Sequence, residues 1–397
     1  MHRIPLARPS VSQAEIDAVS EVLRSGWLSA GPKTVEFEQA LAGWLGVSNV
    51  VAVNSCTSAL HLTLVALGIG PGDEVITSPI TFVSTVNAIL YVGATPVLAD
   101  VDPVSMNIRP GEIARRISPR TKAIIPVHMA GQPCDMDEIH DVAKKRGIPV
   151  VEDAAHALGA SYRGRKIGTL SRATCFSFYA SKNLTAGDGG AVATEDEELA
   201  QRVRRLRFHG ISSDAWKRYG ATTLRSWQAV ELGYKANFTD VQAALALSQL
   251  SRFEHLQARR RDIALRYRRA FEPYGVTFTE LPSRTHANHL FVLKIGEREF
   301  FRQRLAEAGV ATGIHFPAVH LQPYFRRRFG DLSAELPVAT LLSQQIVSIP
   351  LYPDLTDDEV AYVIDVVTRT LDELHTREVG RVTRVKRAAA SPQPAEV

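Results

Sequence analysis

Short apolar runs alternate with helix-forming segments along the first half of the chain. The runs lie at residues 50–53, 74–77, 95–100, 123–127 and 149–152. Because they are apolar almost throughout, both faces of the strands they form should be covered, as in parallel strands joined by helices. The pattern therefore predicts an α/β fold with a mostly parallel sheet. In such sheets, ligands bind beyond the carboxyl ends of the strands.

Helical spacing is clear in two other regions. Residues 12–24 are predicted to form an amphipathic helix, with Ser12 and Glu15 in the arrangement of a capping box. Residues 239–271 are predicted to form one long helix that begins at Thr239. Its early part, VQAALALSQL, is apolar on nearly every side, which favours a buried helix bridging two domains.

The pattern changes after Pro273. A strand is expected at 289–295, a helix at 297–307, an extended segment at 314–316 and a last helix at 357–374. Residues 211–230 look irregular and fit either a surface loop or a substrate or subunit contact. We therefore expect an N-terminal segment (1–30), a large domain (31–255), a small C-terminal α+β domain (256–375) and a disordered basic tail (376–397).

Composition narrows the class of protein. The chain has 397 residues, of which 45% are apolar and 22% charged, and its net charge is +4. These values are ordinary for a globular protein. The sequence has no basic patch with interleaved aromatic residues, so nothing in it points to nucleic-acid binding. The cysteines lack metal-ligand spacing, so no metal is expected, and their number and separation are typical of a reducing compartment. The sequence also has no long apolar run. We therefore expect a cytoplasmic protein that does not bind membranes.

One lysine lies in an unusual setting. The stretch TCFSFYASKNLTAGDGG, residues 174–190, begins as an aromatic-rich strand and reaches Lys182 just beyond it, before a glycine-rich turn. A lysine in a loop is usually solvated. If it is instead desolvated, its pKa falls and its amine becomes a nucleophile.

Three further groups are expected at the same edge of the sheet. The segment NSCTS, residues 54–58, joins a strand to a helix, and the helix N-terminus is either a phosphate site or simply capped by Thr57 or Ser58. Asp153 and His156 follow the strand at 149–152. A phosphate site, an acid and an amine together fit pyridoxal 5′-phosphate (PLP), since the lysine can bind its aldehyde and the acid its ring nitrogen.

The ordered blocks of the sequence resemble those of the DegT/DnrJ/EryC1/StrS family of sugar aminotransferases. Similar stretches include SGWLSAGP, NSCTSALHLTLVALGIGPGDEVITSPITFVSTVNAI, PVVEDAAHALGASYRGRKIG, SFYASKNLTAGDGG, GYKANFTDVQAALALSQL and HFPAVHLQPYF. The resemblance covers about residues 4–375 and is strongest to the subgroup that acts on nucleotide-linked 4-keto sugars. It implies the PLP-dependent transferase fold of type I, similar to aspartate aminotransferase.

The resemblance also implies roles for individual residues. Lys182 would form the internal aldimine with PLP and move a proton during the reaction, and Asp153 would pair with the pyridinium nitrogen. The other implied cofactor contacts are Thr57, Ser58, Phe82, His156, Ser177 and, from the neighbouring subunit, Asn237. His315, His320 and Tyr324 fall in the block near the sugar nucleotide, or are packing or rim residues. A shared site implies a homodimer.

The expected function is transfer of an amino group to a keto sugar. L-glutamate would be the donor and leave as 2-oxoglutarate, and a nucleotide-linked 4-keto sugar would be the acceptor. Two alternatives are a cyclitol ketone of the scyllo-inosose type as acceptor, and a PLP-binding regulator without turnover. Lys182 argues against the family members that dehydrate sugars, because they have His at this position. The triplets Tyr179-Ala180-Ser181 and Ala318-Val319-His320 depart from the pattern of many relatives, the second in a block that shapes the pocket.

Overall fold

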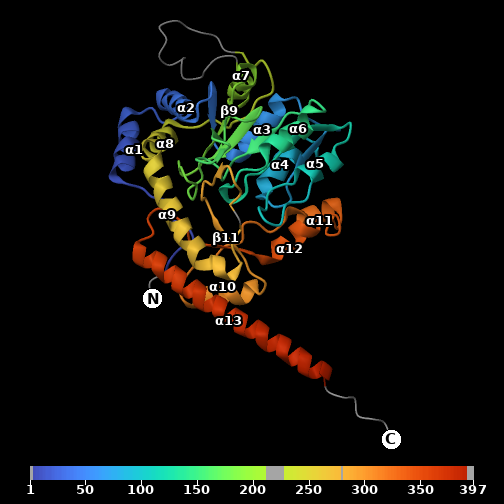
Figure 1. The fold of residues 1–397 in the computed structure, drawn as a ribbon. Coiled ribbons are helices and arrows are strands. Elements are labelled where there is room, and N and C mark those ends of the chain that lie inside the picture. Colours follow the sequence, from blue (N-terminus) through green and yellow to red (C-terminus); the bar gives the residue numbers. More distant parts are fainter. Residues whose placement is uncertain (1–2, 212–227, 279, 391–397) are drawn as a thin grey trace.

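A seven-stranded sheet forms the centre of the described part of the molecule (Figure 1). The computed structural model describes residues 3–211, 228–278 and 280–390, with side chains up to residue 377. The strand order is β3 (Thr95–Leu98), β2 (Glu74–Thr77), β4 (Thr121–Ile125), β5 (Val151–Asp153), β8 (Ala173–Ser177), β9 (Gly190–Thr194) and β1 (Asn49–Val53). Isolated parallel bridges join β4 to β5. All neighbours are parallel except the pairs made by β9, which confirms a mostly parallel sheet.

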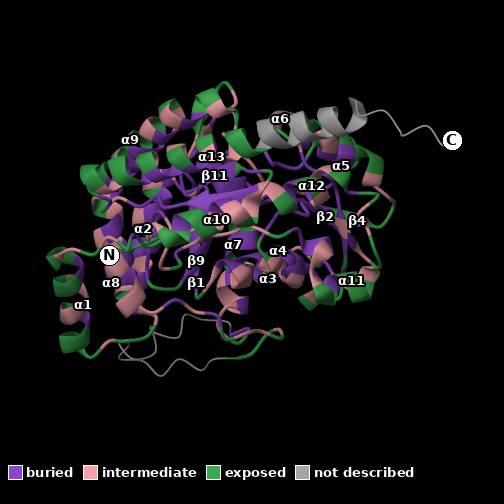
Figure 2. Ribbon diagram, turned by 90° about the horizontal axis from the view of Figure 1, so that it is seen from below, coloured by how far each residue is buried: buried purple, intermediate pink, exposed green. Residues whose placement is uncertain are grey.

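The two faces of the sheet carry separate cores, because alternate strand residues point to opposite sides. Val50 and Ala52 pack with α2 (Pro32–Leu45), α6 (Met136–Lys144) and α8 (Asp240–Ser251). Val51 and Val53 pack with α3 (Cys56–Ala66), α4 (Val83–Tyr91) and α7 (Glu197–Leu206). Figure 2 shows the buried strands inside a shell of helices with exposed outer faces. The α5 helix (Pro110–Arg116) packs on the same face as α2 and α6, with Ile113 in that core.

The C-terminal elements have a third core. It combines α9 (Phe253–Phe271), α10 (Arg298–Glu307) and α13 (Asp357–Ala390) with β11 (Phe291–Lys294) and β12 (Ile346–Ile349), which pair antiparallel. Ile4 joins this core and bridges to Val310. The remaining elements are α11 (Pro323–Phe329), α12 (Pro337–Gln345), the small strands β6 (Ser161–Tyr162), β7 (Arg165–Lys166) and β10 (Arg284–Thr285), and single 3-10 turns at Met129–Gly131, Glu272–Tyr274 and Val319–Leu321.

Several predicted elements have different bounds. The helix α1 (Gln13–Ser25) has the expected capping box of Ser12 and Glu15. The single helix at 239–271 was wrong: the backbone leaves helical geometry at Arg252, whose side chain reaches back to Glu15 and to the Ser10 carbonyl, so α8 and α9 are separate.

The last part of the chain also differs from prediction. Residues 314–316 belong to no strand, since only Gly313 bridges to Ser348. The final helix does not end at 374: residues 376–390, predicted as a disordered tail, lie on α13. Most of the irregular segment at 211–230 lies outside the described residues. In the part of the chain that is described, no helix has the length and apolar character needed to cross a membrane.

Candidate active site

A cavity of about 460 Å³ lies at the carboxyl ends of β5 and β8. Its volume falls in the usual range of small-molecule and cofactor pockets. The C-terminal part of the chain contributes one side of its wall, including His289, Phe316 and Leu351. Of the residues predicted from the sequence, the cavity is lined by Thr57, Phe82, Asp153, His156, Ser177, Lys182 and His315. The sheet edge therefore brings together most of the predicted site.

Lys182 lies on the cavity wall four residues beyond buried Phe178. Its backbone N–H donates to the Tyr179 carbonyl, 2.8 Å away, which closes a tight turn after β8. Burial lowers the pKa of Lys182 to about 8, although the nearby Asp153 carboxylate opposes the shift. Because a desolvated ammonium is costly, the amine has a larger neutral fraction at neutral pH than a solvated lysine.

Asp153 ends β5 and is only 4% exposed. Its carboxylate accepts hydrogen bonds from the Thr85 hydroxyl at 2.7 Å and from the Ala155 backbone N–H at 3.1 Å. Burial raises the pKa of Asp153, and these two hydrogen bonds oppose the rise. Within the described residues Asp153 forms no ion pair. A buried carboxylate without a cation fits the protonated ring nitrogen of PLP.

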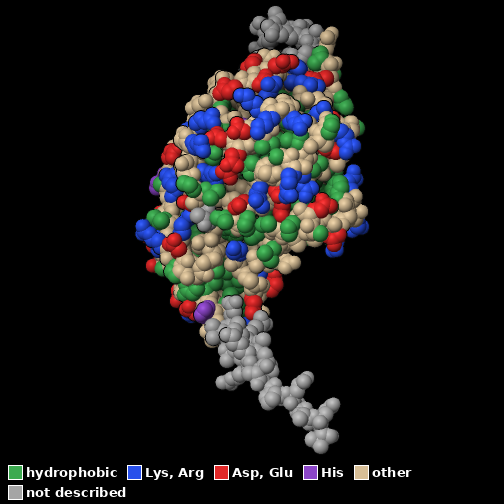
Figure 3. Space-filling view, turned by 45° about the vertical axis from the view of Figure 1, so that its right-hand side comes forward, with side chains coloured by type: hydrophobic (Ala, Val, Ile, Leu, Met, Phe, Trp, Pro, Cys, Tyr) green, Lys and Arg blue, Asp and Glu red, His purple; other side chains and the backbone are tan. Residues whose placement is uncertain are grey.

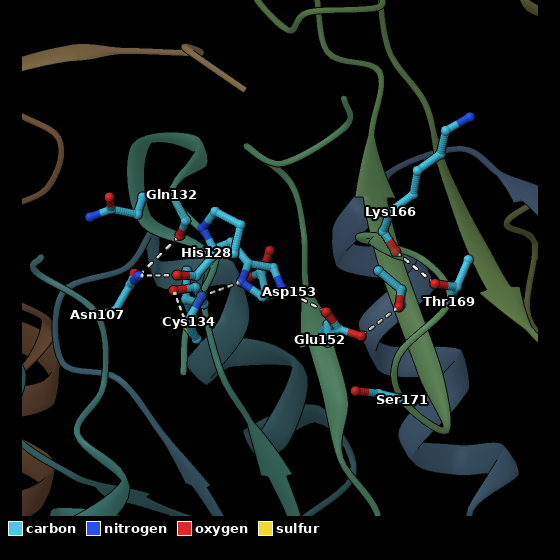
Figure 4. A network of polar contacts seen from close by, with 12 residues as sticks. Asn107, His128, Gln132, Cys134, Glu152, Asp153, Lys166, Thr169 and Ser171 are labelled. Carbon is cyan, nitrogen blue, oxygen red and sulfur yellow. Dashed lines mark hydrogen bonds and ion pairs between the residues drawn. The ribbon is translucent and has the colours of Figure 1, made fainter. Parts of the chain in front are cut away.

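A buried network of polar contacts fixes the chain behind Asp153 (Figure 4). The His128 Nδ1 accepts from the Cys134 N–H at 3.0 Å, so its Nε2 carries the proton and donates to Glu152 at 2.7 Å. The Thr174 hydroxyl donates to the other Glu152 oxygen. The His128 backbone N–H donates to the Asp153 carbonyl. The network thus holds the end of β5, where Asp153 lies, between its two neighbouring strands.

The N-terminus of α3 is the candidate anion site. Ser55 caps the helix by accepting from the Ser58 N–H, and the Ser58 hydroxyl contacts Ser55 Oγ at 3.1 Å. Capping by Thr57 or Ser58 was therefore the wrong alternative. Thr57 lines the cavity together with Ser177 at the end of β8, whereas Ser58 does not. The positive end of the helix dipole and these hydroxyls fit a phosphate group.

Gly190 makes this arrangement of α3 sterically possible. A Cβ atom at Gly190 would lie 2.5 Å from the backbone N of Cys56 and 2.5 Å from the carbonyl carbon of Ser55. Atoms essentially never approach so closely, so only glycine allows β9 to pass directly against the first turn of α3. The glycine-rich turn after Lys182 thus helps to place the helix N-terminus.

Aromatic rings form another wall. Phe82 is 56% exposed although it lines the cavity, and its ring centroid lies 5.6 Å from that of Phe316. The His156 ring stacks on Phe316. Burial holds the pKa of His156 well below its usual value, and its Nδ1 has no hydrogen-bond partner among the described residues. An exposed phenyl face and an unused imidazole nitrogen fit an aromatic cofactor with polar substituents.

The four other predicted residues differ in outcome. His315 lines the cavity and contacts the Ser348 hydroxyl at 2.9 Å; burial lowers its pKa to about 4. The structure does not bring His320 and Tyr324 to the cavity. His320 is buried against Thr340, and Tyr324 is half-exposed on α11 beside Phe325. Asn237 does not line the cavity of its own chain, and its backbone bridges to Val53.

Sequence reasoning missed His289. It is buried in the cavity wall, with its Nε2 3.5 Å from the Lys182 Nζ atom. It starts an apolar strand pattern 107 positions after Lys182, and nothing in that spacing indicates a contact.

Comparisons with known proteins agree with the chemistry of the cavity. The model of the DegT/DnrJ/EryC1/StrS aminotransferase family matches residues 9–368. The spore coat polysaccharide biosynthesis protein SpsC of Bacillus subtilis is 46% identical over 375 residues, which cover 92% of this chain and 96% of SpsC.

Two solved structures are similar over nearly their whole length. The putative sugar aminotransferase Spr1654 of Streptococcus pneumoniae, in its PMP form, has a TM-score of 0.89 and 33% identity, covering 93% of this chain and 99% of that one. Helicobacter pylori PseC, an aminotransferase involved in the biosynthesis of pseudoaminic acid, has a TM-score of 0.87 and 29% identity, covering 94% and 100%. The chain therefore belongs to the DegT/DnrJ/EryC1/StrS family, and it is a PLP-dependent sugar aminotransferase with the type I fold.

Proposed function

We propose that this enzyme transfers the amino group of L-glutamate to a nucleotide-linked 4-keto sugar. The observation that carries the proposal is the placement of the Lys182 amine, the Asp153 carboxylate and the first turn of α3 around one cavity. The names of its relatives support a sugar acceptor, since SpsC belongs to polysaccharide biosynthesis and PseC to the biosynthesis of pseudoaminic acid. We also propose a cytoplasmic homodimer in which Asn237 completes the phosphate site of the other subunit.

The residues of the cavity divide the work of this reaction. When bound, PLP supplies a carbonyl group for covalent attachment and a ring that takes up electrons. Thr57, Ser177 and the N–H groups of α3 would bind its phosphate, and Asp153 would keep its ring nitrogen protonated. Phe82 and His156 would orient its ring.

Lys182 is the residue that moves protons. With a pKa of about 8, about a tenth of its amine is neutral at pH 7 and can accept a proton from the substrate carbon. Ile349 and Leu351, which also line the cavity, would reduce the access of water.

A panel of acceptors with ¹⁵N-labelled L-glutamate tests the proposal. The acceptors are UDP-, dTDP-, GDP- and CMP-linked 4-keto sugars, scyllo-inosose and a 4-keto sugar without a nucleotide, and products are identified by mass spectrometry. We expect ¹⁵N in an amino sugar only with a nucleotide-linked acceptor, together with 2-oxoglutarate. Lys182→Ala is the control and should give no product.

Two outcomes would contradict the proposal. Amination of scyllo-inosose, with none of the nucleotide-linked sugars converted, would assign a cyclitol as the acceptor. A faster reaction with unlabelled L-alanine or L-aspartate than with L-glutamate would reject the proposed donor.

A further inference from the structure

His289 is tied to Lys182 through a short chain of polar contacts. Its Nε2 lies 3.5 Å from Lys182 Nζ, and its Nδ1 lies 3.1 Å from the side-chain oxygen of Asn183. The His289 backbone N–H donates to the Ala130 carbonyl, which also fixes the residue. The His289 imidazole is thus held between the Lys182 amine and the side-chain amide of Asn183, which follows Lys182 in the sequence.

One backbone carbonyl sets the direction of these hydrogen bonds. The carbonyl oxygen of Ala287 accepts from Asn183 Nδ2 at 2.7 Å and from Gln257 Nε2 at 3.1 Å. Because only the NH₂ group of a side-chain amide donates, the nitrogen atoms of Asn183 and Gln257 must face the Ala287 carbonyl. The Asn183 Nδ2 also donates to Gln257 Oε1 at 2.9 Å, which agrees with this assignment.

The tautomer of His289 follows from the same argument. Asn183 turns its oxygen, which only accepts, toward His289 Nδ1, so Nδ1 must carry the proton. The Nε2 atom is then unprotonated, and its lone pair faces Lys182 Nζ. A contact of 3.5 Å is long for a hydrogen bond, but contacts at catalytic groups shorten when the reacting state forms.

The surroundings of His289 keep its ring neutral. Burial lowers the pKa of His289 well below its usual value, and Lys182, His156, Arg260 and His315 lower it further. Of these groups, Lys182 and Arg260 are the cations, and each disfavours a positive charge on the His289 ring. His156 also contacts the His289 ring, with centroids 4.5 Å apart. The lone pair on Nε2 is therefore available at neutral pH.

We propose that His289 is a positioning residue for Lys182, whose Nε2 accepts a hydrogen bond from the lysine amine whenever that amine is free of the cofactor. An unattached lysine side chain has several rotatable bonds and would otherwise sample many positions. The bond holds Nζ at the cavity wall, ready to receive or return a proton. Asn183 fixes the tautomer of His289, and Gln257 helps to orient the Asn183 amide.

The tautomer can be measured directly in the wild-type protein. Full-length enzyme labelled with ¹⁵N-histidine and loaded with pyridoxamine phosphate, which leaves the Lys182 amine free, gives imidazole nitrogen shifts by NMR. We expect His289 to be protonated at Nδ1 and unprotonated at Nε2 at pH 7. Protonation at Nε2, or at both nitrogens, would overturn the proposal.

Carbamoylation of Lys182 by cyanate tests the contact itself, because cyanate reacts with the neutral amine. The rate at Lys182, followed by peptide mass spectrometry over a range of pH, gives the midpoint of its titration. In His289→Leu the ammonium loses an acceptor, so the midpoint should fall by about one pH unit. In His289→Gln the side-chain oxygen can replace Nε2, and the midpoint should stay near that of the wild type.

His286 provides a matched control. It is a partly buried histidine in the same segment but lines a different cavity, and its Nδ1 accepts from the Asn288 N–H. His286→Leu and His286→Gln should leave the midpoint of Lys182 unchanged. An unchanged midpoint in His289→Leu, or an equal shift in His286→Leu, would contradict the proposal. If His289→Leu is insoluble, a midpoint in His289→Gln lowered by a full unit would contradict it equally.

Discussion

The acid–base behaviour of Lys182 depends on the cost of burying its positive charge. A lysine in water titrates near 10.5, whereas burial in the cavity wall lowers the pKa of Lys182 to about 8. Asp153 limits this effect, since its negative charge stabilises the ammonium. Burial and the Asp153 charge therefore have opposite effects on the pKa of Lys182. Together they give an amine that can both donate and accept protons near neutral pH.

This balance predicts the pH dependence of cofactor uptake. Since only the neutral amine attacks a carbonyl, the rate at which the cofactor-free protein binds PLP covalently should rise about fifty-fold from pH 6 to pH 8. Above the pKa of about 8 the rate should level off, because the lysine is already neutral. Stopped-flow absorbance of the bound cofactor measures the rate, and Lys182→Ala is the blank. A rate that still rises tenfold per pH unit beyond pH 9 would indicate an ordinary solvated lysine.

At the level of elements, the proposed phosphate site depends on the packing of β9 against α3. Ser55 sets the first turn of α3, and Gly190 allows that turn to rest directly on β9. The hydroxyl residues were expected from their sequence position alone. Their orientation depends on this contact between two elements that are more than a hundred residues apart.

Gly190→Ala should therefore weaken cofactor binding without touching the cofactor. The added methyl group would overlap the backbone of Ser55 and Cys56 and displace the helix N-terminus, at a cost of about 1–3 kcal/mol in stability. Denaturant unfolding and titration with PLP measure the two effects.

A glycine in open space serves as the control for this substitution. Gly43 lies within α2 with no atom within 4 Å of an added Cβ, so Gly43→Ala should bind PLP normally and be as stable as the wild type or more so. Equal PLP affinity in both variants would rule out the close contact as the cause.

On the scale of the whole molecule, one predicted cofactor residue, Asn237, does not line the cavity of its own chain. Its side-chain amide donates to the neighbouring Phe238 carbonyl. In the proposed homodimer it would serve the partner's site. Lys and Arg side chains alternate with Asp and Glu on the face shown in Figure 3, so that face has no extended patch of one charge.

Mixing two inactive variants tests whether the sites are shared. Asn237→Ala and Lys182→Ala should each be strongly impaired. After unfolding and refolding together in equal amounts, half of the dimers should be hybrids with one intact site each. The mixture should then recover about a quarter of the wild-type activity. Activity no higher than the mean of the two variants would show that Asn237 acts within its own chain.

The sequence was sufficient for the local chemistry and for the class of fold. The apolar runs predicted the parallel strands, because burial on both faces requires such runs. Lys182, Asp153 and Thr57 could be placed at one sheet edge because each directly follows a strand or begins a helix. Such predictions rest on short-range patterns, which a single sequence contains.

Only the tertiary structure decided the contacts between distant segments. It placed His289 beside Lys182, left His320 and Tyr324 away from the cavity, and made Gly190 necessary beneath α3. It also separated α8 from α9 at Arg252, whose side chain contacts Glu15. These features depend on how separate elements of the fold pack against one another. Residue spacing along a chain carries no direct signal for packing between elements so far apart.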